Sequence, residues 1–250
     1  MPIKAADIML NVLDKIDSTN NYAMQKVYAG LASDGDAYFT CNQLSGKGQR
    51  GKLWLSETGK NIALSIVIKP MGLGISSQFY LSAAVALGAF DFFCNYAGDE
   101  TAIKWANDIY WRDRKAGGIL IENVLTGSEW KWAIAGIGLN INQTRFSKTL
   151  NNPVSLKQVT GRDYDVTQLA GELYHSVMHR INELHSGSHG RKKIISQYNT
   201  HLFKKNETVR LKKGNIAFET KICKVLSNGQ LITKDTLERH FEFGEVEWVL

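Results

Sequence analysis

Along the first two thirds of the chain, segments with a helical spacing of apolar side chains alternate with segments typical of strands. Residues 76–96 and 166–185 follow the helical pattern, and the first is apolar almost all round, which predicts a buried helix. A shorter helix is expected over residues 18–28, because its polar first residues can cap an N-terminus. Six apolar runs have the length and composition of strands: residues 10–17, 36–42, 61–70, 102–108, 117–125 and 130–141.

The pattern changes after about Lys205. Residues 206–250 contain short alternating runs and no helical periodicity, and Gly214-Asn215 and Asn228-Gly229 are hairpin-turn signals between the runs. This spacing predicts a small five-stranded β-barrel. We therefore expect an α+β domain over residues 1–205, with a sheet covered by helices, followed by a small β domain over residues 206–250.

The composition, with 44% hydrophobic and 22% charged residues in 250, is that of an ordinary globular protein. No apolar run reaches the length of a membrane span and the N-terminus lacks a signal-peptide core, so we expect no membrane partner. The three cysteines, Cys41, Cys94 and Cys223, lie far apart and lack the spacing of metal ligands, so no metal site is expected in the protein. Their odd number and wide separation favour the cytoplasm. The net charge of +6 favours an anionic partner without choosing among nucleic acid, nucleotide and acidic protein.

The stretch Ser45–Lys52, SGKGQRGK, places three glycines and three cations in a loop between two predicted strands. Glycines let backbone N–H groups approach a ligand closely, and Lys47, Arg50 and Lys52 add the positive charge that a phosphate would need. A solvated basic hairpin explains the same stretch, and the loop lacks the Walker pattern. The loop alone therefore leaves both interpretations open.

Four further polar clusters lie at or near the ends of predicted strands: Asp17–Asn20, Lys104–Asp108, Arg114–Gly118 and Gly136–Asn142. Each has an ordinary explanation, such as a helix cap, a turn, or a bulge or close packing at a glycine. Five such clusters in one domain nevertheless favour a shared functional site.

In this order and approximate spacing, the five clusters resemble the motifs of the biotin protein ligases. Gly46–Lys52 is similar to the family's G-R-G-R-R-G-R, with Lys47 and Gln49 in place of arginines. Lys104–Asp108 is similar to K-W-P-N-D, and the stretch GEVEWV near the end resembles the family's small SH3-like domain. The remaining matches are Ser18–Asn20 to S-T-N, Lys115–Leu120 to K-x-A-G-I-L and Gly136–Asn142 to G-I-G-x-N-x-N.

The resemblance implies a class II synthetase-like catalytic domain with a mixed sheet, followed by an SH3-like barrel. It also implies an enzyme that uses ATP and Mg²⁺ to convert biotin into biotinyl-5′-AMP and then transfers biotin to a lysine of a biotin carboxyl carrier protein domain. Some family members carry an N-terminal DNA-binding domain. Here the first predicted strand begins close to the start of the sequence, so we expect no such domain and no DNA partner. A homodimer is compatible with the resemblance.

The resemblance also assigns roles to individual residues. Lys115 and Arg50 are expected to offset the repulsion between the biotin carboxylate and the α-phosphate, and Asp108 or Lys104 to place or deprotonate the acceptor lysine. Mg²⁺ is expected to arrive with ATP near Asn140. The residues expected at biotin or the adenylate are Ser18, Thr19, Asn20, Gln43, Gly46, Lys47, Gly48, Gln49, Trp54, Lys115, Gly117 and Gly118. Those expected at the nucleotide are Arg50, Lys52, Asn107, Gly138, Leu139 and Asn140.

Two alternatives to a biotin ligase stay open. A lipoate or octanoate protein ligase resembles the same catalytic fold, although the glycine loop together with KAGGIL favours biotin. A nucleic-acid-binding module built on the basic loop and the C-terminal barrel would show a steep salt dependence. That module leaves Ser18–Asn20 and Asn140 unexplained.

Overall fold

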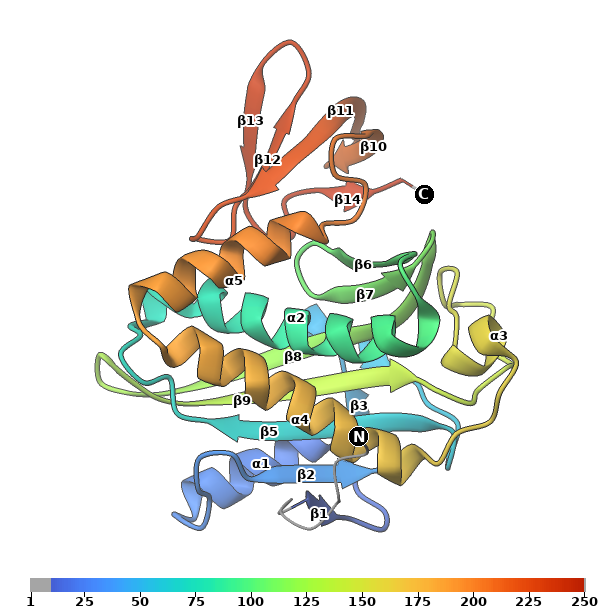
Figure 1. Cartoon of the computed structure of the whole chain (residues 1–250), viewed down its shortest axis with the longest axis vertical. Helices are drawn as coiled ribbons and strands as arrows, with labels where there is room; N and C mark the ends of the chain where they lie inside the picture. The colour runs from blue at the N-terminus through green and yellow to red at the C-terminus, as the bar shows by residue number, and fades with distance from the viewer. Residues whose placement is uncertain (1–9, 250) are drawn as a thin grey trace.

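The computed structural model describes residues 10–249. Its larger sheet has seven strands, which are, in spatial order, β1 (Leu10–Val12), β2 (Ala37–Thr40), β5 (Asn61–Ile68), β9 (Glu129–Asn140), β8 (Arg114–Thr126), β7 (Asp108–Trp111) and β6 (Thr101–Lys104). Among these described strands, β1 and β2 run parallel and all other neighbours are antiparallel. The predicted α+β fold with a mixed sheet is confirmed (Figure 1).

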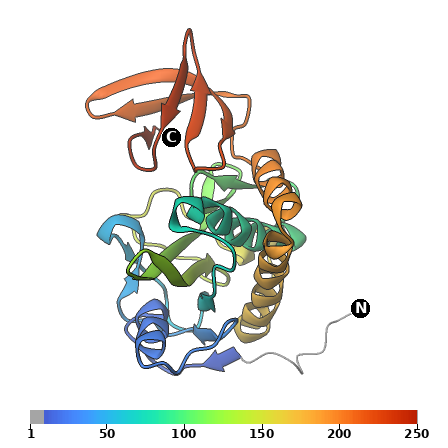
Figure 2. The ribbon, with the colours of Figure 1, turned by 90° about the vertical axis from the view of Figure 1, so that its left-hand side faces the viewer.

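Helices lie on both faces of this sheet. The helices in the described part of the chain are α1 (Thr19–Tyr28), α2 (Gln78–Ala97), α3 (Leu156–Thr160), α4 (Val166–His185) and α5 (Ser188–Thr200). Helices α2 and α4 cover one face, and α1 packs on the other (Figure 2). The alternation along the strands explains this arrangement, because Val67 and Ile134 pack with Ala23 of α1 while Ile66 and Ala135 belong to the core under α2 and α4. The α1 face is therefore the one left partly open for a ligand.

The segment Ile75–Ala97, a short 3₁₀ turn followed by α2, corrects one expectation. By length and composition alone it is apolar enough to cross a membrane. In the folded protein, however, 67% of its apolar 18-residue window is buried, against α4, α5 and the sheet. Such burial is typical of a core helix, as the pattern of residues 76–96 predicted.

The single strand predicted over residues 102–108 is wrong. Strand β6 ends at Lys104 and β7 begins at Asp108, and the three residues between them form a turn. The apolar pattern continued through this turn because Trp105 is buried, with 6% of its surface exposed. Burial of a turn residue imitates the periodicity of a strand.

Other elements were shorter than expected or were not expected at all. The strand predicted over residues 10–17 ends at Val12. Helices α3 and α5 were not predicted, and α5 is short of apolar side chains because it packs on other helices along a narrow face. Within the glycine loop, β3 (Gly46–Lys47) and β4 (Leu53–Trp54) pair as a small hairpin.

The C-terminal part has the five strands that were predicted, and they pair as one antiparallel sheet. Its strands are β10 (Thr208–Lys213), β11 (Ile216–Val225), β12 (Leu231–Lys234), β13 (Glu238–Phe241) and β14 (Glu247–Trp248), in the spatial order β13-β12-β11-β10-β14. Two of its turns contain Gly214 and Gly229 with φ of 59° and 95°, which favours glycine there. The proposed boundary at residue 205 falls between α5 and β10.

The C-terminal sheet packs directly on the larger part (Figure 1). The indole Nε1 of Trp105 donates to the Gly229 carbonyl at 2.8 Å, and the Val225 backbone N–H donates to the Asn199 side chain at 2.6 Å. Buried residues of both parts belong to one continuous hydrophobic cluster. The orientation of the small sheet is therefore fixed by core packing as well as by hydrogen bonds.

Candidate active site

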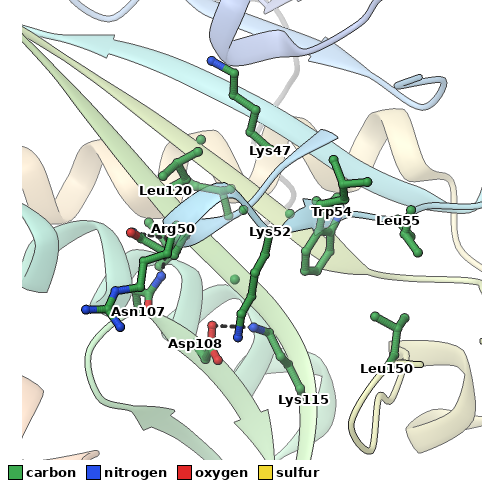
Figure 3. A pocket seen from close by; sticks show the side chains of 18 of the residues that line it. Lys47, Arg50, Lys52, Trp54, Leu55, Asn107, Asp108, Lys115, Leu120 and Leu150 are labelled. Atoms are coloured by element: carbon green, nitrogen blue, oxygen red, sulfur yellow. Dashed lines mark hydrogen bonds and ion pairs between the residues drawn. The ribbon is translucent and has the colours of Figure 1, made fainter. Parts of the chain in front are cut away.

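An open cavity of about 570 Å³ lies on the α1 face of the sheet, beside the C-terminal sheet (Figure 3). All five of the polar sequence clusters contribute to its wall, although they are spread from residue 17 to residue 142. The predicted site residues that line it are Ser18, Thr19, Asn20, Gln43, Lys47, Gly48, Gln49, Arg50, Lys52, Trp54, Lys104, Asn107, Asp108, Lys115, Gly118, Gly138 and Asn140.

Three predicted site residues do not line the cavity. Leu139 is fully buried in the core under α2, because Gly138 and Asn140 take the cavity face of β9 and the residue between them faces the other way. Gly117 is paired with Leu139 on that same far face, where a Cβ atom would lie 2.2 Å from the leucine Cδ2. Gly46 packs inside the hairpin, where a Cβ atom would lie 2.4 Å from the Trp54 carbonyl oxygen. These residues shape the wall without facing the cavity.

The start of α1 brings its polar side chains to the cavity through an unexpected cap. Ser18 occupies the N-cap position, as predicted, but its side chain makes no cap hydrogen bond. The Gln43 side-chain oxygen instead accepts a hydrogen bond from the Thr19 backbone N–H at 2.9 Å. Because Gln43 caps the helix, the Ser18 hydroxyl is not used by the helix and remains at the cavity wall.

Two residues that were not predicted hold the Asn20 amide in one orientation. The Ser65 hydroxyl donates to Asn20 Oδ1 at 2.6 Å, and Asn20 Nδ2 donates to Glu122 Oε2 at 2.8 Å. The other oxygen of Glu122 lies 3.3 Å from Lys47 Nζ, so the carboxylate connects α1 to the glycine hairpin. Ser65 and Glu122 stand inside apolar strand patterns, which do not indicate that these two side chains face a site.

Two glycines of β9 allow side chains from other elements to lie directly on the sheet. A Cβ atom at Gly136 would be 2.3 Å from Asn20 Oδ1, and one at Gly138 would be 2.5 Å from Trp54 Cε2. The Trp54 indole N–H is buried and makes no hydrogen bond with any described residue. Close packing is thus the structural reason for the G-x-G pattern, and it places an unpaired donor at the wall of the cavity.

The glycine-rich stretch forms a hairpin that extends over the cavity. Its tip contains Arg50 and Gly51 in the left-handed region, with φ of 56° and 74°. Arg50 Nη1 donates to the Gly244 carbonyl of the C-terminal sheet at 3.1 Å, and its guanidinium lies 5.6 Å from the centre of the Phe243 ring. The basic hairpin that the sequence left as an alternative is therefore present, and it borders the cavity (Figure 3).

A second group of charges lies across the cavity from α1. Lys115 Nζ and Asp108 Oδ1 form an ion pair at 2.7 Å, and Lys52 extends from the hairpin toward this pair (Figure 3). The Asn140 amide nitrogen donates to the Val154 carbonyl at 3.1 Å. Among the described residues there is no cluster of three or more His, Cys, Asp or Glu side chains that could hold a metal ion.

Lys104 is the most buried cation of the cavity wall. Only 8% of its surface is exposed, and its Nζ donates to the Tyr110 hydroxyl at 3.0 Å. Burial lowers the pKa of Lys104 to about 8, an effect that Asp108 partly opposes and Lys115 reinforces. The same desolvation raises the pKa of Tyr110 well above its ordinary value.

The cavity also has walls that the sequence motifs did not indicate. Tyr110 and Leu150 line it from the larger part of the protein, and Phe243 and Trp248 line it from the C-terminal part. Their hydrophobic character made them indistinguishable from core residues in the sequence.

The model of the biotin/lipoate A/B protein ligase family matches residues 12–140. The chain belongs to this family. The matched range contains four of the five polar clusters that meet at the cavity and includes the fifth as far as Asn140.

Two curated relatives from bacteria have similar sequences. The bifunctional ligase/repressor BirA of Escherichia coli is 34% identical over 143 residues, which cover 56% of this chain and 43% of that protein. The biotin–[acetyl-CoA-carboxylase] ligase of Paracoccus denitrificans is 32% identical over 161 residues, which cover 62% of this chain and 65% of that protein. The chain thus matches less than half of the length of BirA.

A solved structure extends the similarity to nearly the whole chain. The biotin protein ligase from Aquifex aeolicus in complex with biotin and ATP superposes with a TM-score of 0.78 at 22% identity. The superposition covers 95% of this chain and 97% of that one. It confirms that the mixed sheet and the C-terminal sheet together have the fold of a biotin protein ligase of this family.

Proposed function

We propose that the protein is a biotin protein ligase of the cytoplasm. It converts biotin and ATP into biotinyl-5′-AMP and pyrophosphate. It then transfers biotin to a lysine of a biotin carboxyl carrier protein domain. The observation that carries the proposal is the convergence of all five polar clusters on one cavity. The names of the relatives, biotin–[acetyl-CoA-carboxylase] ligase and BirA, support the same reaction.

The α1 side of the cavity suits the ureido ring of biotin. This ring presents two N–H donors and one carbonyl acceptor, and Ser18, Thr19 and Asn20 offer hydroxyl and amide groups of both kinds. The Asn20 amide is already oriented by Ser65 and Glu122, so little conformational freedom is lost when a ligand binds. The half-buried ring of Trp54 supplies an apolar surface for the bicyclic system.

The opposite side of the cavity suits the meeting of two anions. The biotin carboxylate has to attack the α-phosphate of ATP, forming a mixed anhydride and releasing pyrophosphate, and the two groups repel each other. Lys115 and Lys52 lie where they can stabilise this charge as it is redistributed. The protein contributes position and charge, and no covalent intermediate with the enzyme is needed.

The site suits Mg²⁺ only when the ion is bound together with ATP. Mg²⁺ in nucleotide sites is held mainly by phosphate oxygens and water, with one or two protein oxygens. The side-chain oxygen of Asn140 can supply such a protein oxygen, and the described residues contain no cluster of three or more His, Cys, Asp or Glu side chains. Bound in this way, the ion would offset phosphate charge.

Transfer requires a neutral amine of the acceptor lysine to attack the anhydride carbonyl, releasing AMP. Asp108 is suited to orient that amine, because the ion pair with Lys115 uses its Oδ1 and leaves its Oδ2 without an ion pair. A carboxylate held in this way accepts a proton from, or a hydrogen bond of, the attacking nitrogen.

The test is to incubate the purified protein with labelled ATP, Mg²⁺ and one free acid at a time. Biotin-dependent release of pyrophosphate, with little release for lipoate and octanoate, is the expected result. Release with lipoate or octanoate alone would reassign the protein within the family. Absence of release with every acid would refute a ligase.

A nucleic-acid-binding module is less well supported. Residues 206–250 contain seven Lys and Arg and seven Asp and Glu, so the C-terminal sheet has no excess of positive charge. On the hairpin, Lys47 is already paired with Glu122. Oligonucleotide binding with a steep salt dependence would contradict this assessment.

A further inference from the structure

Lys104 lies in a box of aromatic rings to which three separate segments contribute. Its Nζ is 4.5 Å from the ring centre of Tyr110 on β7, 5.2 Å from that of Trp248 on β14 and 6.0 Å from that of Phe203, which follows α5. The faces of such rings attract a cation and exclude water from it. The ammonium group is thereby held in one place at the wall of the cavity.

Most of the other cationic side chains of the cavity wall already form an ion pair or a hydrogen bond with a protein group. Lys47 is paired with Glu122 and Lys115 with Asp108, and Arg50 donates to the Gly244 carbonyl. In the described part of the chain, no carboxylate forms an ion pair with Lys104, whose only hydrogen-bond partner is the neutral Tyr110 hydroxyl. A buried cation without an anionic partner is unfavourable unless an anion binds beside it.

We infer that Lys104 binds a phosphate group of the nucleotide and that Trp248 of the C-terminal sheet holds it in position for this contact. The inference rests on the proposed function and gives the C-terminal sheet a direct part in nucleotide binding. Lys104 is then a substrate-binding residue, whereas Trp248 is a positioning residue that acts through it.

The charged groups around Lys104 make this contact detectable by proton uptake. Asp108 of β7, Asp113 of the following turn and Lys115 of β8 act on the pKa of Lys104, and the neutral Tyr110 hydroxyl accepts its hydrogen bond. Strand β14 presents the uncharged ring of Trp248 to Lys104, and its Glu247 lines the same cavity. Burial lowers the pKa of Lys104 to about 8, so a large share of the free protein has a neutral Lys104 at about pH 8.5. An arriving phosphate favours the charged form and raises this pKa, so the complex takes up a proton at that pH.

The test is a calorimetric titration of the biotin-saturated protein with α,β-methylene-ATP, in two buffers of different ionisation enthalpy at about pH 8.5. The wild type is expected to take up a proton on binding. K104M should bind about 10- to 150-fold more weakly, the range for losing a charged hydrogen bond, and without that uptake. K104R should regain most of the affinity but still take up no proton, because arginine stays charged.

A second measurement on these variants distinguishes the loss of the Lys104–phosphate contact from a general loss of structure. Biotin affinity, measured in the same proteins, should be unchanged, because Lys104 is expected to contact only the nucleotide. Nucleotide binding by K104M that equals the wild type in affinity and proton uptake would overturn the inference and leave the proposed function intact. Failure of the biotin-saturated wild type to bind the nucleotide at all would overturn both.

The role of Trp248 is tested with a matched pair of substitutions. W248F keeps an aromatic ring and should bind the nucleotide nearly as the wild type does. W248L keeps an apolar cover without a ring and should bind it about 2- to 30-fold more weakly, the range of a cation–π contact. Equal binding by the two variants would show that Trp248 does not position Lys104.

Discussion

Gly138 and Trp54 are packed so closely that a side chain at position 138 would displace the indole ring. A Cβ atom at Gly138 would lie 2.5 Å from Trp54 Cε2 and 2.8 Å from its Nε1. Both distances are well inside van der Waals contact. The glycine on β9 thus determines how near the hairpin lies to the sheet.

Replacing Gly138 by alanine is expected to weaken biotin binding. The ring of Trp54 has to move, and overpacking of this kind costs about 1–3 kcal/mol, which corresponds to a loss of about 5- to 150-fold in affinity if the strain falls on the bound state. Titration calorimetry with biotin measures the effect. Gly74→Ala is the control, because a Cβ atom there meets only Ser76 Oγ at 3.9 Å. Equal affinities for the two variants would contradict the packing argument.

The Glu122 carboxylate contacts both Asn20 and Lys47, and two substitutions separate the effects of these contacts. Glu122→Gln keeps an oxygen that can accept the Asn20 hydrogen bond but removes the ion pair with Lys47, which is partly exposed and worth about 1 kcal/mol or less. Its biotin affinity should therefore fall by no more than about 5-fold. Glu122→Leu removes both contacts and should have the larger effect. A larger loss in the glutamine variant would show that charge on the hairpin, and not the orientation of Asn20, dominates binding.

Lys115 and Asp108 form one ion pair but are expected to act in different half-reactions. Lys115→Ala should slow biotin-dependent pyrophosphate exchange by about 10²–10³, the scale for losing one group that stabilises the transition state. Asp108→Asn should slow transfer to an acceptor domain more than it slows this exchange. Assays of both steps on both variants check the assignment. Near-normal exchange by Lys115→Ala would remove Lys115 from the adenylation step.

Lys104 should make the stability of the protein depend on pH. Burial lowers its pKa from 10.5 to about 8. Between these values the unfolded chain keeps the proton that the folded protein has lost, so this residue makes the free energy of unfolding rise with pH. The pKa difference corresponds to about 3 kcal/mol at most.

The comparison with Lys104→Met isolates this effect. Because methionine does not titrate, the stability of the variant relative to the wild type should fall by up to about 3 kcal/mol from about pH 7 to about pH 10.5. Urea unfolding at the two pH values measures the difference. Substitution of the exposed Lys148 by methionine is the control. A relative stability that does not change with pH would mean that Lys104 keeps an ordinary pKa in the folded protein.

The order of elements, the two-part layout and most of the cavity wall could be predicted from the sequence. The sequence motifs were sufficient to predict that residues such as Lys115 and Asn20 belong to the site. Their side chains are polar at positions where a strand or helix of the core would be apolar. Leu139 was misplaced because it belongs to the same motif as Gly138. Only the alternation of the strand shows that these neighbours face opposite sides of the sheet.

The residues that were missed share another property. Ser65 stands alone in an apolar run, and Glu122 is followed there by Asn123 only. One or two polar residues in such a strand are normally read as its solvent face. Trp248 lies in the stretch GEVEWV, which indicated the small C-terminal domain but no site residue. Its contact with Lys104 depends on how two sheets pack, which local patterns do not report. Contacts of this kind follow from tertiary structure.

The cavity is bordered by Ser18 at one end of the chain and by Trp248 near the other. While the protein is being synthesised, a ribosome that has passed residue 142 has made all five polar clusters, yet the box around Lys104 still lacks two of its three rings, those of Phe203 and Trp248. If the ring of Trp248 is needed to bind ATP, a chain that has not yet reached residue 248 does not activate biotin, and no reactive anhydride forms on it.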